Sequence, residues 1–391
     1  MEKVKTHWLL VFVLWLSGIA AAMQFAKFSV AFDLLNIQYS VSSFWTGLSL
    51  SIVGLVGLIF GVSASIYVPK IGHKKILLIS LLLGVIISFV QALNPVFPIL
   101  FISRIIEGIS HLGIVVTAPV VIILASSEKH HSLVMGLWSS FFGIAFSVTA
   151  WVGRPIFEFY SIFALFFVHA LLMVFTMVLL IVLIKKINIP YKETNRVSFF
   201  AAHKSVYSNW RTFSPGVLFF FHTFMFIALF TFLPGFSGNE NSRNFLLIIL
   251  PLISIIGTFV AGIVSQYFIS PSRLCVFAFI SLIVLVSIIK FSFDNSMIFV
   301  SASMILILFS GIIQGSVFSL IPKISLSTQD QTSANGAVAQ LGNLGSTLGP
   351  PTFSYFIAFG KDSIIIIVML LSVLGVISGV FITRKIKKAI I

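Results

Sequence analysis

The stretch FISRIIEGISHLGIVV, residues 101–116, contains an arginine, a glutamate and a histidine within a long apolar run. A helix needs about 20 mostly apolar residues to cross a bilayer. Arg104, Glu107 and His111 recur at i, i+3 and i+7, so a helix carries them on one face. A charge at the bilayer centre costs at least about 2.5–3.5 kcal/mol on insertion scales. That face is therefore expected to look into protein or a wet cavity.

The composition of the whole chain points to lipid as its solvent. Of its 391 residues, 59% are hydrophobic and 9% are charged, whereas soluble domains are about 45–50% apolar and about 25% charged. Apolar segments long enough to cross a bilayer recur along the whole sequence. We predict twelve helices in two groups of six: 8–30, 44–68, 76–94, 98–124, 131–156 and 160–184, then 213–235, 244–268, 273–291, 297–322, 333–358 and 363–383.

Basic residues are distributed unevenly between the two sets of loops that these helices define. One set holds 18 of the 24 Lys and Arg residues, and the other holds only Arg243, Lys290 and Lys361. Because Lys and Arg concentrate in cytoplasmic loops and the number of helices is even, both termini are predicted to be cytoplasmic. The basic residues are scattered over short loops, so no nucleic-acid partner is expected.

The two groups of six helices resemble copies of each other. Three segments match in the same order: RIIEG (104–108) with GIIQG (311–315), GRPIF (153–157) with GPPTF (349–353), and LIKKI (183–187) with ITRKIKK (382–388). Duplicated six-helix halves are typical of secondary transporters with a site near the midplane. We therefore predict an all-α membrane protein of two pseudo-symmetric six-helix bundles: an N-terminal bundle 1–184, a cytoplasmic linker 185–212 and a C-terminal bundle 213–391.

The loop SIYVPKIGHKKILL, after the second predicted helix, resembles the basic loop of the major facilitator superfamily, G-x-x-x-D-R-x-G-x-R-R. The residues that match are Lys70, Gly72, Lys74 and Lys75. The resemblance implies that they form a loop that helps to set the conformational state. Pro69 replaces the family's Asp, which ties this loop to neighbouring helix ends, and Ser65 replaces the first Gly. We therefore expect a different lock between the outward-open and inward-open states.

Two further segments carry the same resemblance, which covers nearly the whole chain. RIIEGISHLG is similar to the superfamily's R-x-x-Q-G-x-G pattern, with Arg104 and Gly108 matching and Glu107 in place of Gln. AVAQLGNLGSTLGPP (337–351) resembles the Gly/Pro-rich eleventh helix of many bacterial members. The resemblance implies a secondary transporter and leaves the subfamily open.

Arg104 and Glu107 have two interpretations. In the functional one, Arg104 binds an anionic substrate and Glu107 carries a proton. In the structural one, the two neutralise each other and only fix the helix in place. The counterpart in the second half, Gly311 to Gln314, lacks both charges, which favours the functional interpretation. His111 on the same face is predicted to contact substrate, with a hydrogen-bonding core residue as the alternative.

Two charged residues accompany the first predicted helix. Lys27 follows Gln24 by about one turn, and we interpret it as a second cation for the substrate. The alternative is a lysine that extends to the outer headgroups. Asp33 lies nearer the outer end and is a second candidate proton carrier, or simply the start of the outer loop.

Three more residues are candidates for the substrate site. Arg154 is predicted to draw anions to the outer mouth, or to anchor the interface in a pair with Glu158. Gln340 and Asn343 lie on one face of the eleventh helix and are predicted to bind substrate. Their alternative role is hydrogen bonding between helices, worth about 0.6 kcal/mol each on average.

Taken together, three cations in or near the membrane and one securely embedded acid favour a small organic anion as substrate. Proton symport would compensate its charge, so the predicted function is secondary active transport by alternating access. The alternative is efflux of amphiphilic or drug-like compounds. No G-x-x-x-x-G-K-[ST] or H-E-x-x-H motif occurs, so neither an ATP-driven pump nor an enzyme is expected. We expect no metal or cofactor. The protein is expected to be a monomer in a bacterial inner membrane. Its expected partners are the lipid bilayer, protons and a small-molecule substrate.

Overall fold

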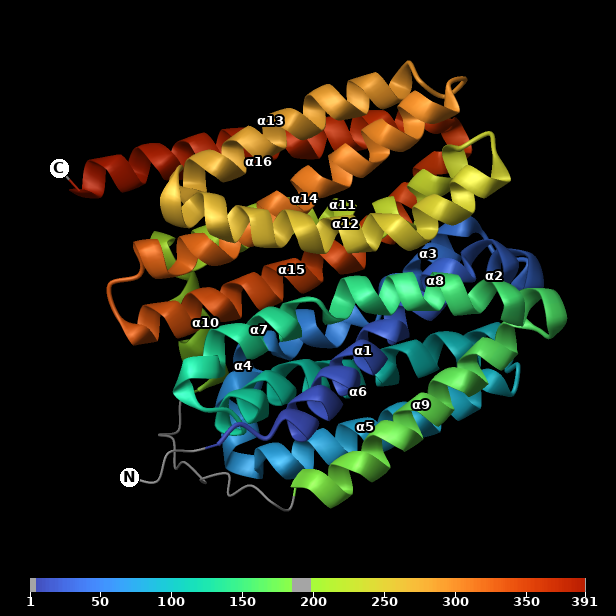
Figure 1. Cartoon of the computed structure of the whole chain (residues 1–391), viewed down its shortest axis with the longest axis horizontal. Helices are drawn as coiled ribbons and strands as arrows, with labels where there is room; N and C mark the ends of the chain where they lie inside the picture. Colours follow the sequence, from blue (N-terminus) through green and yellow to red (C-terminus); the bar gives the residue numbers. More distant parts are fainter. Residues whose placement is uncertain (1–4, 185–197, 391) are drawn as a thin grey trace. The chain divides into compact units, whose positions relative to one another are not determined.

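The computed structural model describes residues 5–184 and 198–390 (Figure 1). Within these ranges every regular element is a helix, as expected where lipid cannot hydrogen bond to an open backbone. The predicted linker 185–212 is therefore described only from residue 198 onward. For some residues the backbone is described without the side chain: 65–67, 69, 70, 132, 154, 158, 202, 205, 328, 329 and 390.

The chain divides into two compact units. Unit 1 comprises Met1–Ser40 and Ser63–Ser198, and unit 2 comprises Val41–Val62 and Phe199–Ile391. The segment Val41–Val62 lies early in the sequence, yet it packs with the helices of the second half. The boundary between the predicted bundles, which follows chain order, stays a prediction, and each unit is described below by itself.

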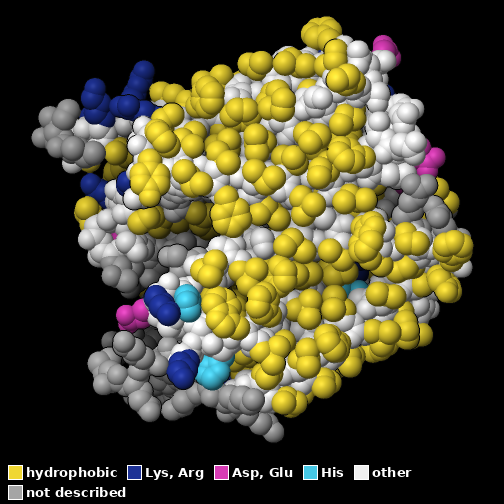
Figure 2. Space-filling view, in the orientation of Figure 1, with side chains coloured by type: hydrophobic (Ala, Val, Ile, Leu, Met, Phe, Trp, Pro, Cys, Tyr) yellow, Lys and Arg dark blue, Asp and Glu magenta, His cyan; other side chains and the backbone are white. Residues whose placement is uncertain are grey.

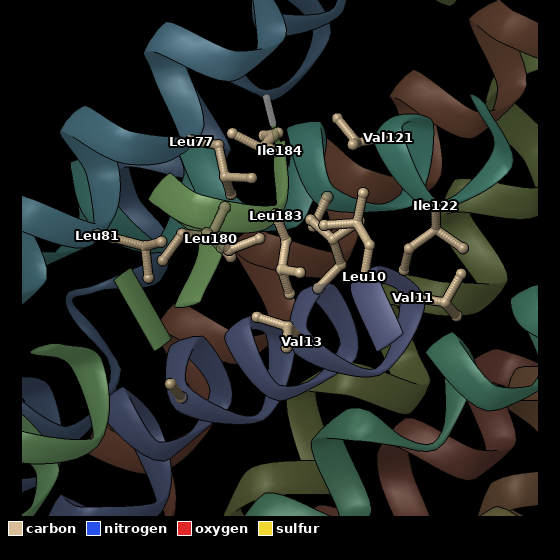
Figure 3. Packing of buried hydrophobic residues seen from close by; sticks show 14 of the residues in the cluster. Leu10, Val11, Val13, Leu77, Leu81, Val121, Ile122, Leu180, Leu183 and Ile184 are labelled. Carbon is tan, nitrogen blue, oxygen red and sulfur yellow. The ribbon is translucent and has the colours of Figure 1, made fainter. Parts of the chain in front are cut away.

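Unit 1 contains most of the first group of predicted helices. Its elements are α1 (Trp8–Val30), α2 (Phe32–Tyr39), the last part of α4 (Gly54–Ile71), α5 (His73–Ala92), α6 (Phe97–Leu124), η1 (Glu128–His130), α7 (His131–Ser139), α8 (Phe141–Phe159) and α9 (Ile162–Leu183). An apolar core lies between α1, α5, α6 and α9 (Figure 3). It includes Leu10, Val13, Leu77, Leu81, Val121, Ile122, Leu180 and Leu183.

The fifth predicted span of unit 1 is broken into α7 and α8. The two helices meet at Ser140 with a bend of 43°. The hydroxyls of Ser139 and Ser140 donate to the backbone oxygens of Gly136 and Leu137, each over 2.7 Å. Such hydrogen bonds three residues back compete with the helix ladder and bend it.

Unit 2 contains α3 (Ser43–Ser51), the first part of α4, α10 (Phe199–Tyr207), α11 (Trp210–Phe232), η3 (Leu233–Phe236), α12 (Glu240–Tyr267), α13 (Pro271–Lys290), α14 (Ser296–Ile324), α15 (Thr328–Phe356), η4 (Ile357–Phe359) and α16 (Lys361–Ile390). Among the described residues of unit 2, the side chains that cap a backbone N–H at a helix start are Asn209, Asn239, Asn295 and Ser327. Such caps satisfy donors that a helix leaves unpaired.

Glycines bring the helices of unit 2 into backbone contact. A Cβ on Gly257 of α12 would lie 2.1 Å from the oxygen of Leu308, and one on Gly311 of α14 would lie 2.1 Å from the oxygen of Ser254. A Cβ on Gly47 of α3 would likewise lie 2.9 Å from the Pro350 oxygen of α15. Small residues at such crossings let membrane helices pack closely.

All twelve predicted spans correspond to a helix or a broken helix pair, and α2 and α10 are short additions outside them. In the described part of the chain, ten helices are long and apolar enough to cross a membrane, and the bent pair α7 and α8 makes an eleventh. The helix α15 has 29 residues but a polar composition. Figure 2 shows hydrophobic side chains covering the helix flanks on the face in view, as expected for surfaces that meet lipid.

Gly257→Ala is predicted to destabilise the protein, because the new Cβ meets the Leu308 backbone oxygen, which cannot move without shifting α14. Overpacking of this kind costs about 1–3 kcal/mol. Gly262→Ala in the same helix is the matched control, because a Cβ there meets nothing within 4 Å. The midpoint of thermal unfolding of the purified protein is expected to fall for Gly257→Ala only. Equal midpoints for both variants would contradict the close packing of α12 and α14.

Candidate functional site

A polar layer crosses the same four helices that form the apolar core of unit 1. Lys27 lies six residues from Ala21 of that core, and His169 lies four residues from Met173. At 1.5 Å per residue, these separations are about 6–9 Å along the helices, so the polar layer adjoins the core. The helices α1, α5, α6 and α9 contribute Lys27, Ser88, Gln91, Ser103, Arg104, Glu107 and His169, which we call the charged cluster. These seven side chains are at most 3% exposed.

The Glu107 carboxylate lies at the centre of the charged cluster. The Lys27 ammonium donates to its Oε1 over 2.6 Å, and the Gln91 amide donates to its Oε2 over 2.9 Å. The Arg104 guanidinium, one turn away on α6, forms an ion pair with the same Oε2. Both carboxylate oxygens are therefore held by donors from three helices, an arrangement that stabilises the ionised form.

Lys27 lies inside unit 1, which excludes the interpretation that it extends to the headgroups, because the residue is 0% exposed. Its Nζ donates to Gln91 Oε1 over 2.7 Å and lies 3.4 Å from Ser88 Oγ and 3.3 Å from His169 Nδ1. The three ammonium protons thus have four acceptors within reach, counting Glu107.

Arg104 combines its ion pair with an aromatic contact. Its Cζ lies 3.9 Å from the centroid of the Phe28 ring, and that ring stacks on Phe166 at 5.2 Å. A guanidinium is attracted to the face of an aromatic ring, more strongly when water is excluded. With Lys27 and Arg104 charged and Glu107 ionised, the charged cluster carries one net positive charge.

Two histidines connect the backbone of α1 to α9 and α6. His169 Nε2 lies 2.8 Å from the Ala20 oxygen, and His111 Nδ1 lies 3.0 Å from the Ala21 oxygen. Because a carbonyl oxygen only accepts, each of these nitrogens carries a proton. His169 Nδ1 is then left as an acceptor toward Lys27, and it also lies 2.8 Å from Ser88 Oγ. His111 is half-buried and belongs to this polar layer.

A close helix contact borders the charged cluster. Gln24 Nε2 donates to Ser110 Oγ over 3.0 Å, while Gln24 Oε1 has no hydrogen-bond partner among the described residues. A Cβ on Gly84 of α5 would lie 2.7 Å from Ser110 Oγ and 2.9 Å from Met173 Cε. Only glycine therefore fits beside this amide without a shift of its neighbours.

The other charged candidates of the first half are Asp33 and Arg154. Asp33 is exposed in the first turn of α2, which follows the end of α1. Arg154 and its predicted partner Glu158 lie on α8, and their side chains are outside the described ones. The structure thus brings Lys27, Arg104, Glu107 and the nearby His111 into one region.

Gln340 and Asn343 are engaged with helices of unit 2. Gln340 Nε2 donates to the Leu58 oxygen over 2.7 Å and lies 3.1 Å from His203 Nε2, and Tyr207 donates to Gln340 Oε1 over 2.7 Å. Burial raises the pKa of Tyr207, which keeps this phenol a donor. Asn343 packs against Gly57 and donates to the Ala339 oxygen of its own helix over 2.8 Å. These contacts favour the alternative in which both residues hold helices together.

The predicted conformational loop is almost entirely helical. The helix α4 runs to Ile71 and α5 begins at His73, so Gly72 alone connects them. Gly72 has φ +102°, a left-handed conformation that favours glycine. Lys74 is half-buried and Lys75 is exposed in the first turn of α5, and the Lys70 side chain is outside the described ones.

Sequence reasoning missed four members of the charged cluster: Ser88, Gln91, Ser103 and His169. Each is a polar residue inside an otherwise apolar predicted helix. A buried polar group needs a hydrogen-bond partner. That requirement was the signal in the sequence that these residues contact polar groups of other helices. The partners come from other helices, and no spacing within one helix reveals which face meets which.

These features define a class of protein. Helices of membrane-crossing length surround a buried cluster of ionisable residues, and such residues mark ion or solute pathways by default. The chain matches the family model described as Major Facilitator Superfamily over residues 14–350, and it belongs to that family. It is therefore a multi-pass membrane protein of the twelve-helix, two-bundle fold and a secondary transporter. A comparison with curated proteins yields no match.

Glu107→Gln is predicted to destabilise the protein strongly. It removes the only carboxylate among the described members of the charged cluster and leaves Lys27 and Arg104 buried without an anion. Loss of one partner from a buried ion pair costs about 3–5 kcal/mol.

Lys27→Met is the comparison variant, because it leaves the Arg104–Glu107 pair in place. The midpoint of thermal unfolding in detergent is expected to fall further for Glu107→Gln than for Lys27→Met. The reverse order would show that Glu107 is not the group that balances the two cations.

Proposed function

We propose that the protein transports a small organic anion together with protons by alternating access. Glu107 is the proton site, and Lys27 and Arg104 are the cations that meet the substrate. The observation that carries this proposal is one buried carboxylate held between two buried cations. Location in a bacterial inner membrane is part of the proposal.

The coupling follows from charge balance. Protonation of Glu107 removes the only negative charge of the described cluster and leaves two positive charges within the membrane. Each buried charge costs at least about 2.5–3.5 kcal/mol on insertion scales. An anion that binds Lys27 and Arg104 offsets this cost. Proton binding therefore favours anion binding, and by linkage the reverse also holds.

Access to the site requires a conformational change, because Lys27, Arg104 and Glu107 are 0% exposed. Protonation of Glu107 weakens the contacts that join α1, α5 and α6 at this level. The same event then releases the cations and loosens the helices around them. The half-buried His111 is a polar neighbour for the substrate.

The remaining candidates have smaller roles in this proposal. Asp33 is exposed, so the proton is assigned to Glu107. Gln340 and Asn343 are assigned to helix contacts. Arg154 keeps its predicted role at the outer mouth. The basic loop around Gly72 remains the candidate for setting the conformational state.

The efflux alternative makes a different prediction about substrates. A cluster with one net positive charge repels cationic drugs, which favours the anion. A strain that lacks the protein is therefore expected to keep its sensitivity to a panel of cationic amphiphiles. Increased sensitivity that expression of the protein reverses would favour efflux.

Uptake in proteoliposomes tests the coupling. With a panel of radiolabelled mono- and dicarboxylates, uptake of at least one is expected to rise when the outside becomes acidic and to collapse with a protonophore. Glu107→Gln is expected to lose this pH dependence. Its net uptake is expected to fall at least about tenfold, which corresponds to a loss of about 1.4 kcal/mol of coupling free energy.

Asp362→Asn is the control, because that carboxyl is exposed and 3.7 Å from Lys290. It is expected to keep the wild-type pH profile. Uptake that is indifferent to pH and to protonophores would contradict proton coupling, and an unchanged profile in Glu107→Gln would move the proton to another group.

A further inference from the structure

Two cations of unit 2 share one aromatic ring. Trp210 begins α11, and its ring centroid lies 5.0 Å from Arg211 Cζ and 5.2 Å from Lys385 Nζ of α16. The two charges are therefore no more than about 10 Å apart. In the described part of the chain neither is ion-paired with a carboxylate. The described residues thus provide no anionic partner for this pair of like charges.

A groove leads from Trp210 and Lys385 along the two helices. It has a volume of about 320 Å³, with Trp210 and Lys385 at one end. Its walls include Phe213 and Val217 of α11 and Ile377 and Phe381 of α16. On each helix the two residues are one turn apart and lead away from the charged end. Ile377 and Phe381 are 60% and 63% exposed, so the groove opens toward lipid.

One polar atom in the groove has no partner. Ser214 lines it and is 4% exposed, and its Oγ has no hydrogen bond among the described residues. A buried hydroxyl normally finds a partner. Ser214 can therefore donate to an oxygen of a molecule that occupies the groove.

We propose that this groove, the α11–α16 groove, binds one anionic phospholipid. The phosphate lies between Arg211 and Lys385, an oxygen near it accepts from Ser214, and an acyl chain follows the apolar walls. The combination of charge at one end and apolar surface beyond it fits an amphiphile better than a soluble anion. Basic pockets between membrane helices recognise anionic headgroups in this way, and tryptophan is enriched at headgroup level.

The surroundings of the groove add charge of the same sign. The last turns of α16 carry Arg384, Lys387 and Lys388, and residues 363–391 contain no acid. In Figure 2, Lys and Arg side chains gather beside the end of α16. Each basic residue near the surface strengthens attraction to anionic lipid.

The test measures the thermal midpoint of the full-length protein in detergent with added phosphatidylglycerol or with phosphatidylcholine of the same acyl chains. Phosphatidylglycerol is expected to raise the midpoint more than phosphatidylcholine does. Arg211→Gln and Lys385→Gln are expected to lose at least half of this difference, and Lys385→Arg is expected to keep it.

Lys361→Gln is the matched control, because Lys361 also faces an aromatic ring, Phe293 at 4.8 Å, but outside the groove. It is expected to keep the full difference. Val217→Trp, which fills the groove and keeps both charges, is expected to lose it. Inorganic phosphate at the same concentration is expected to leave the midpoint unchanged.

Three results would overturn the proposal. The first is equal midpoints with the two lipids in the wild type. The second is a difference that survives Arg211→Gln and Lys385→Gln. The third is a shift with inorganic phosphate as large as that with phosphatidylglycerol, which would make the site one for soluble anions.

Discussion

The polar interior of unit 1 depends on the Glu107 carboxylate. It accepts from Lys27 of α1, Gln91 of α5 and Arg104 of α6, so one side chain connects three helices. In lipid, the hydrophobic effect contributes little to the association of helices, so van der Waals packing and hydrogen bonds contribute more. A charge-assisted network at this depth therefore fixes how the helices are rotated as well as how they are spaced. The same network is the natural place for a protonation event to change both.

The two pseudo-repeats solve the same packing problem differently. Glu107 and Arg104 correspond to Gln314 and Gly311 in the second half. There, Gly311 allows the Ser254 backbone of α12 to come close, and a neutral pair, His222 and Ser310 at 3.2 Å, joins α11 to α14. The second half thus replaces ionic contacts with glycine-mediated backbone contacts. Among the described residues, the buried carboxylate Glu107 lies in the first half and the second half has none, which is why we propose that coupling belongs to the first half.

Much of the fold was predictable because it follows from local rules. The lipid requirement sets the length of each helix, and each of the twelve predicted spans corresponds to a helix or a broken helix pair. The pair Arg104 and Glu107 was visible because i and i+3 share a face. Lys27 was named as a second cation, but its contact with Glu107 was beyond such rules, as were Gln91 and His169, because these contacts depend on the rotation and register of α1, α5 and α9. The bend at Ser140 was missed because serine is compatible with a straight helix unless its hydroxyl bonds to the preceding turn.

The segment Val41–Val62 shows why chain order and packing need not agree. Its Ser51 Oγ donates to the Thr347 oxygen of α15 over 2.8 Å, and Gly47 and Gly54 fit against the same helix. These contacts assign the segment to unit 2, although it is covalently joined to unit 1 at both ends. One of those joints follows Ser40, which has φ 48°, a left-handed conformation uncommon for a residue with a side chain. Any relative movement of the units must be absorbed at these two joints or must break the contacts with α15, so the segment couples the backbone of the first half to the packing of the second.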